Sequence, residues 1–170
     1  MQKIVTPSGM VATFEGSAVR ELSAHDSARH RLPVTVQLRG NVPREQLALW
    51  DAFNALDVMI VTSQMAAEIR AFSDRDWPLR PARVFCQGAQ LNKDFVVLII
   101  DVHSPISVLR ATEADWAPDA AYPVQPEACL EHGVALDKEL LFPVLSDDLI
   151  DHLRRAGFAF EARRYPVSQT

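Results

Sequence analysis

The stretch Val58-Met-Ile-Val61, followed by Thr62 and a helical pattern that runs to Phe72, decides the fold. The apolar run is typical of a buried strand, and the hydroxyl of Thr62 is suited to capping a helix. Met65 and Ile69 follow at the spacing of one helix face. The stretch therefore predicts a strand that leads directly into an amphipathic helix.

The same order of features recurs near the end of the chain. An apolar run covers Leu140 to Leu145, Ser146 can cap a helix, and a helical pattern continues to Ala156. Gly157 then ends the helix, and a last strand follows. When Thr62 is placed on Ser146, the helix positions coincide as Met65 with Leu149, Ile69 with Leu153 and Phe72 with Ala156. The sequence therefore predicts two strand–helix–strand units.

The chain of 170 residues is long enough for one domain with its own core. Phe95 to Ile100 is apolar at every position, which predicts a strand covered on both faces at the centre of the sheet. After Pro43, we expect a helix that buries Leu47, Trp50 and Phe53. The resulting prediction is an α+β or α/β domain with a mixed central sheet and helices packed on it. Residues 1–50 remain unassigned.

Composition excludes several classes of protein. The cysteines Cys86 and Cys129 lie far apart without metal-ligand spacing, which argues against a disulfide scaffold and favours a reducing compartment. The N-terminus has no apolar core of a secretory signal, and the longest apolar run is too short to span a bilayer. We therefore expect a cytoplasmic protein without membrane contact, metal or cofactor.

The negative charge of the chain is concentrated in one segment. Residues 113–151 contain ten acids and one base, a net charge of −9, whereas the rest of the chain carries +4. Such a surface attracts cationic partners and repels nucleic acid. A solvated, solubilising surface is the other interpretation of the same pattern.

Catalytic motifs are absent from the sequence. The six glycines form no phosphate-binding loop, and Cys86 stands in an apolar run without a neighbouring histidine. Asp101 and His103 follow the central strand, where α/β enzymes often carry catalytic groups. They are the best enzymatic candidates, although a structural turn explains them as well. His132 and His152, close to carboxylates, fit either a base or ordinary helix-end residues.

A protein interface fits the acidic segment better. Trp116 and Tyr122 stand among prolines and acids, and aromatic anchors beside steering charges are typical of binding surfaces. The same rings could instead pack back onto the core. The predicted partner-binding residues lie on a loop and on the last helix: Glu113, Asp115, Trp116, Asp119, Tyr122, Asp147, Asp148 and Asp151.

The order of these segments resembles a family of bacterial immunity proteins that are encoded beside polymorphic toxins and were first catalogued as a domain of unknown function. The resemblance covers roughly residues 55–165 and is carried by four stretches: Ile60-Val-Thr-Ser63, Pro81 to Phe85, Asp94 to Val102, and Leu141 to Leu149 with Ala156-Gly-Phe158. It implies a non-enzymatic protein that binds and blocks a cognate toxin during bacterial competition. Toxins that act on nucleic acid present cationic clefts, which an acidic protein can fill.

Three hypotheses follow from the sequence. The first is a toxin-neutralising immunity protein whose partner has a cationic surface. The second is a small enzyme that uses Asp101 and His103 at a strand end. The third is an adaptor subunit of a larger assembly. A single tight, stoichiometric partner would separate the first hypothesis from the second.

Overall fold

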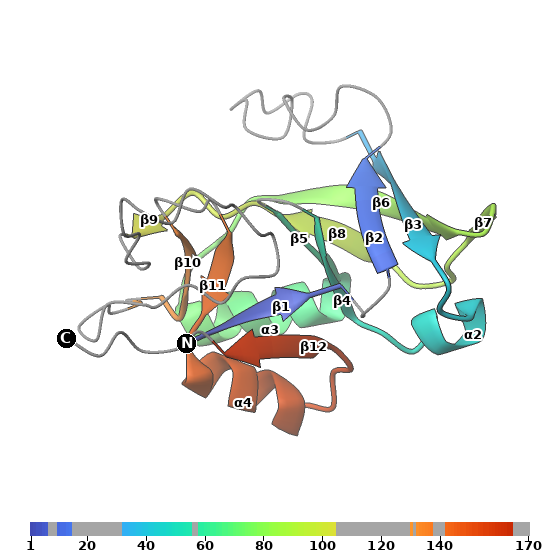
Figure 1. Cartoon of the computed structure of the whole chain (residues 1–170). Coiled ribbons are helices and arrows are strands. Elements are labelled where there is room, and N and C mark those ends of the chain that lie inside the picture. The colour runs from blue at the N-terminus through green and yellow to red at the C-terminus, as the bar shows by residue number, and fades with distance from the viewer. Residues whose placement is uncertain are drawn as a thin grey trace, which may run out of the picture.

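The computed structural model describes residues 1–6, 10–14, 32–55, 58–104, 130, 132–137 and 142–164. Strands dominate this part of the chain, and they form two separate sheets (Figure 1). Both predicted strand–helix–strand units are present, one attached to each sheet.

The larger sheet has seven strands and contains the first unit. Its main path runs in the order β2-β3-β6-β8-β5-β4, and β7 pairs with β6 alone. The strands are β2 (Met10–Phe14), β3 (Val34–Gly40), β4 (Ala52–Ala55), β5 (Val58–Thr62), β6 (Leu79–Cys86), β7 (Ala89–Gln90) and β8 (Phe95–Leu98). The end strands β2 and β4 touch, so the sheet curls into a nearly closed barrel. The inside is filled by a cluster that includes Phe53, Ile60, Val84, Phe95 and Val97.

The smaller sheet has five strands in the order β12-β1-β11-β10-β9 and contains the second unit. Its strands are β1 (Gln2–Val5), β9 (His103–Ser104), β10 (Val134–Asp137), β11 (Pro143–Leu145) and β12 (Glu161–Arg164). Only β9 and β10 run parallel; the other neighbours are antiparallel. The N-terminal strand β1 thus lies between two strands from the end of the chain.

The two units share one topology. In the first, β5 leads into helix α3 (Ser63–Ser73) and then β6, with the antiparallel strand β8 inserted between β5 and β6. In the second, β11 leads into helix α4 (Asp147–Arg155) and then β12, with the antiparallel strand β1 inserted. Both are split β–α–β units. In the first unit, the inserted strand β8 follows the rest of the unit along the chain. In the second unit, the inserted strand β1 precedes it.

The repeat extends to the preceding hairpins and to the helix caps. Val61 pairs with Ala52 on β4, and Leu145, its counterpart, pairs with Val134 on β10. The hydroxyl of Thr62 accepts a hydrogen bond from the N–H of Met65 at 3.4 Å. The hydroxyl of Ser146 accepts one from the N–H of Leu149 at 3.2 Å. The predicted alignment of the two units and both predicted caps are confirmed.

One apolar cluster joins the two units. The four aligned positions on the predicted helix faces, Met65, Ile69, Leu149 and Leu153, are all fully buried. They share this cluster with Leu98 on β8 and with Ile4, the equivalent residue on β1. Helices α3 and α4 contact each other directly. The sheets also meet where β1 touches β4.

Two sequence expectations are corrected. A single central sheet is wrong, because each unit completes its own sheet with its own inserted strand. The helix after Pro43 is also much shorter than expected: α2 covers only Arg44–Leu47. Phe53 lies instead on β4, where it pairs with Ile60 and faces the barrel interior. Buried backbone N–H and C=O groups that lack hydrogen-bond partners cost free energy. Pairing with the buried strand β5 therefore outweighs the helical spacing of the apolar residues after Pro43. Strand β8 is an inner strand, as predicted, but it ends at Leu98 and not at Ile100.

No helix within the described residues is both long and apolar enough to cross a lipid bilayer.

Candidate functional site

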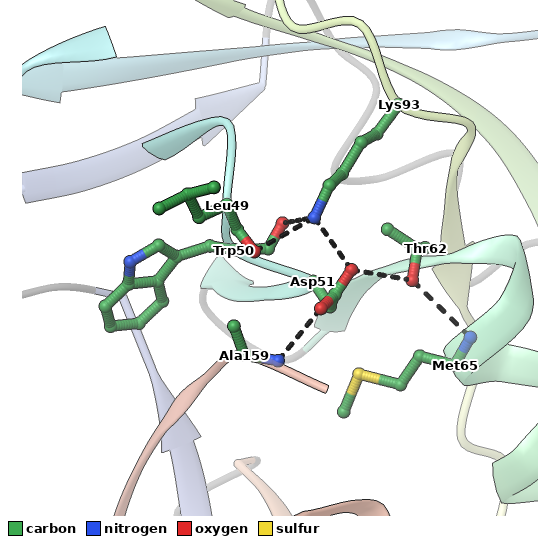
Figure 2. A network of polar contacts seen from close by, with 7 residues as sticks. All are labelled: Leu49, Trp50, Asp51, Thr62, Met65, Lys93 and Ala159. Atoms are coloured by element: carbon green, nitrogen blue, oxygen red, sulfur yellow. Dashed lines mark hydrogen bonds and ion pairs between the residues drawn. The ribbon is translucent and has the colours of Figure 1, made fainter. Parts of the chain in front are cut away.

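The most concentrated polar arrangement surrounds Asp51, which directly precedes β4 (Figure 2). Lys93, from the turn before β8, donates to Asp51 Oδ1 at 2.9 Å. The same ammonium group donates to the carbonyl of Leu49 at 3.0 Å and to the carbonyl of Trp50 at 3.1 Å. A lysine ammonium has three hydrogens, so each has an acceptor in this network.

Asp51 also reaches across to the second unit. Its N–H donates to the carbonyl of Ala159 at 2.7 Å, and its Oδ2 accepts from the N–H of Ala159 at 2.8 Å. Ala159 lies between α4 and β12, so this one aspartate ties the end of the second unit to the start of β4. Thr62 completes the network, since its hydroxyl lies 3.4 Å from Asp51 Oδ1.

A pocket of about 250 Å³ lies beside this network. Its other walls come from the first turn of α3 and from Asp94, whose carboxylate accepts a hydrogen bond from the Ser63 hydroxyl at 2.7 Å. The lining residues are Asp51, Thr62, Ser63, Gln64, Lys93 and Asp94. The charged side chains of this lining are each held by another part of the chain. The arrangement suits a joint between the two units better than chemistry on a substrate.

The predicted partner-binding residues divide into two groups. Glu113, Asp115, Trp116, Asp119 and Tyr122 lie outside the described residues. Asp147, Asp148 and Asp151 lie on α4, close to the predicted helix start. Of the predicted partner-binding surface, the structure therefore describes the part on helix α4.

Asp147 is bound within the fold. Its Oδ1 accepts from the Gln2 amide at 2.7 Å, and its Oδ2 accepts from the Met1 amine at 3.0 Å. The Gln2 hydrogen bond is the main cause that lowers the pKa of Asp147, assisted by the Met1 amine and Arg164 and opposed by burial. This acid anchors β1 to α4.

The neighbouring acids on α4 are more accessible. Asp148 is exposed, and the Asp151 side chain is 65% exposed, with Arg154 Nη1 at 3.9 Å. Asp137, by contrast, is completely buried on β10. The acidic surface is therefore smaller than the charge of segment 113–151 suggests, because some of its acids serve the fold.

Asp101 is half of an ion pair. Arg75 Nη2 contacts Asp101 Oδ1 at 2.9 Å, and the Arg75 guanidinium also stacks over the ring of Trp77. His103 lies on β9, where its backbone pairs with Leu136. This ion pair links the segment after α3 to the segment after β8.

His132, His152 and Cys86 have structural environments as well. His152 Nε2 donates to Glu68 at 3.0 Å, which bridges α4 and α3. His132 Nδ1 donates to the carbonyl of Ser73 at 3.3 Å. Cys86 is buried in the barrel, and this burial raises the pKa of its thiol. A raised pKa disfavours the reactive thiolate.

Sequence reasoning missed the pairing of Asp51 with Lys93. These residues are 42 positions apart, and neither stands in a recognisable motif. The sequence holds no local signal for Asp51, because the spacing of the apolar residues around it predicted a helix and not the start of a strand. Within the described residues, no group of three or more potential metal-binding side chains lies together. Comparison of the sequence with protein-family models and with curated proteins finds no match.

Proposed function

We propose that the chain is a non-enzymatic immunity protein that binds a bacterial protein toxin through an acidic surface. The observation that carries the proposal is the acidic segment 113–151, which ends on helix α4 with Asp148 and Asp151 exposed. Exposed acids of this kind steer a cationic partner into an encounter. Helices α3 and α4 pack through one apolar cluster, and α3 thereby supports the acidic helix α4.

The contacts of Asp101, one of the two best enzymatic candidates, and of Lys93 beside the pocket support binding over catalysis. Asp101 pairs with Arg75, and every hydrogen of the Lys93 ammonium has an acceptor. A catalytic base or nucleophile needs a reacting partner at hydrogen-bond distance. The polar contacts of these side chains are instead made within the fold.

The test uses the product of the gene adjacent to that of this chain. We expect the two purified proteins to form a stoichiometric complex and the toxic activity to disappear at one equivalent of this chain. Failure to bind would contradict the proposal. So would suppression of the activity by amounts far below one equivalent, because turnover would then be required.

Charge variants locate the surface. Asp148→Asn with Asp151→Asn removes two acids from α4, and we expect weaker binding through slower association. Glu45→Gln with Asp76→Asn is the matched control, because both side chains are exposed and the change in net charge is identical. Equal losses in the two variants would indicate a general charge effect without a docking surface on α4.

A further inference from the structure

Strand β6 carries a buried cation at one end of the barrel. Arg80 is only 5% exposed, and burial alternates along the strand so that Arg80 shares a face with Ala82, Val84 and Cys86. Those three residues belong to the barrel interior, as does Val97, the partner of Arg80 on β8. The guanidinium is therefore set among apolar residues at the margin of the core.

The position follows from unequal strand lengths. Strand β3 pairs with β6 from Val34 opposite Ala82 onwards, so the first residues of β6 extend past the start of β3. Pro81 is accommodated in this overhang, where β6 has a neighbour on one side only. Arg80 lies in the same overhang, beside the chain that leads into β3.

The hydrogen bonds of Arg80 are incomplete. Its Nε donates to the carbonyl of Leu32 at 2.9 Å, and its Nη1 is buried without a hydrogen-bond partner among the described residues. No carboxylate of the described part of the chain lies within ion-pair distance of it. A buried charge without a counter-ion is strongly unfavourable. The other buried polar side-chain atoms of the described residues have partners, which sets this guanidinium apart.

We propose that Arg80 is the binding residue for a small oxyanion, a carboxylate or phosphate group, at this end of the barrel. The planar guanidinium presents parallel donors that match two oxygens of one such group. The covering segment is at the surface, since Leu32, whose carbonyl accepts the hydrogen bond from Nε, is 63% exposed. Access therefore needs a displacement of this segment and leaves the sheet intact.

The experiment follows the Arg80 Nε–H signal of the full-length ¹⁵N-labelled protein by NMR. Inorganic phosphate or acetate replaces chloride at constant ionic strength. We expect a saturable shift of this signal and a higher thermal midpoint at saturation. Arg83→Met is the matched control, because Arg83 is exposed on the opposite face of the same strand, and it should respond like the wild type. Arg80→Lys keeps the charge without the parallel donors and should lose most of the midpoint rise.

Arg80→Met is expected to fold, because an apolar side chain replaces an unpaired buried charge, and it should show no midpoint rise with either anion. An equal rise in Arg80→Met and in the wild type would overturn the proposal. An Arg80 signal that is insensitive to both anions would overturn it too, and would point to a carboxylate of this chain as the permanent counter-ion.

Discussion

At the residue scale, Asp147 has two roles. It is the first residue of helix α4, and it holds β1 by accepting hydrogen bonds from Gln2 and the Met1 amine. An acid in the first turn also benefits from the positive end of the helix dipole. The sequence predicted the helix start and placed Asp147 in a partner-binding surface. The contact with β1 could not be foreseen, because it joins residues 145 positions apart.

The pH dependence of stability tests this anchor. The pKa of Asp147 is lower in the folded chain, so its carboxylate stabilises the fold above the unfolded-state pKa and loses this effect as the pH falls through the folded-state pKa. We expect the difference in unfolding free energy between wild type and Asp147→Asn to be largest near neutral pH and to shrink below about pH 4. In a Gln2→Met background the difference should be smaller at neutral pH. A difference that stays constant with pH contradicts the assignment.

Gly133 offers a second test at this scale. It adopts φ +71°, and an added Cβ would lie 2.9 Å from Phe72 Cε1. Gly88 has a similar φ of +77° but open space around it. We expect Gly88→Ala to cost about 1 kcal/mol through backbone strain. Gly133→Ala should cost a further 1–3 kcal/mol, roughly the penalty of overpacking. Equal losses in chemical denaturation would show that Phe72 moves aside freely.

At the scale of elements, the features that sequence reasoning recovered are local. The caps at Thr62 and Ser146 and the buried faces of α3 and α4 depend on residues within one or two turns. Strand partners depend on distant segments, which explains why the place of β1 and the separation of the sheets were not predicted. Phe53 illustrates the difference, because its spacing fits a helix whereas its partner Ile60 fixes it in a strand.

Truncation of Leu153 measures how much the apolar contact between α4 and the shared cluster contributes to the free energy of unfolding. Leu153 is completely buried, so Leu153→Ala should cost about 2–5 kcal/mol. Leu49 is 68% exposed, and Leu49→Ala should change stability by less than about 0.5 kcal/mol. Urea unfolding of both variants gives the comparison. A midpoint for Leu153→Ala that matches the wild type would mean that the α4 register is wrong.

At the scale of the whole molecule, two split units are held together by an apolar cluster and by the Asp51 network (Figure 2). The Lys93 and Asp51 side chains are 28% and 16% exposed, so their contact is partly shielded from water. Lys93→Met should destabilise the chain by about 1.5–3 kcal/mol, the usual range for hydrogen bonds to charged groups.

The same substitution has a local signature. The N–H of Ala159 bonds to the Asp51 carboxylate, so its hydrogen exchange should quicken in Lys93→Met. Arg44→Met is the control, since exposed Arg44 makes only a surface contact with the carbonyl of Gln90. Unchanged exchange at Ala159 would show that the network does not couple the units.

The acidic surface could be predicted only as a concentration of charge. In the folded chain these acids have different environments: Asp137 is buried, Asp147 is anchored to β1, and Asp148 and Asp151 are exposed. Sequence charge alone does not make this distinction, because it depends on which strands and helices come together. The two exposed acids on α4 are therefore the sharpest place to test the proposed function.

The most direct measurement is the association rate with the product of the adjacent gene across a salt series. Steering by an acidic face predicts fast association at low salt that slows as the Debye length falls to about 8 Å at physiological ionic strength. Asp148→Asn with Asp151→Asn should flatten this dependence, whereas Trp116→Ala should mainly speed dissociation. An association rate that ignores both salt and the loss of the two acids would contradict a toxin-binding surface on α4.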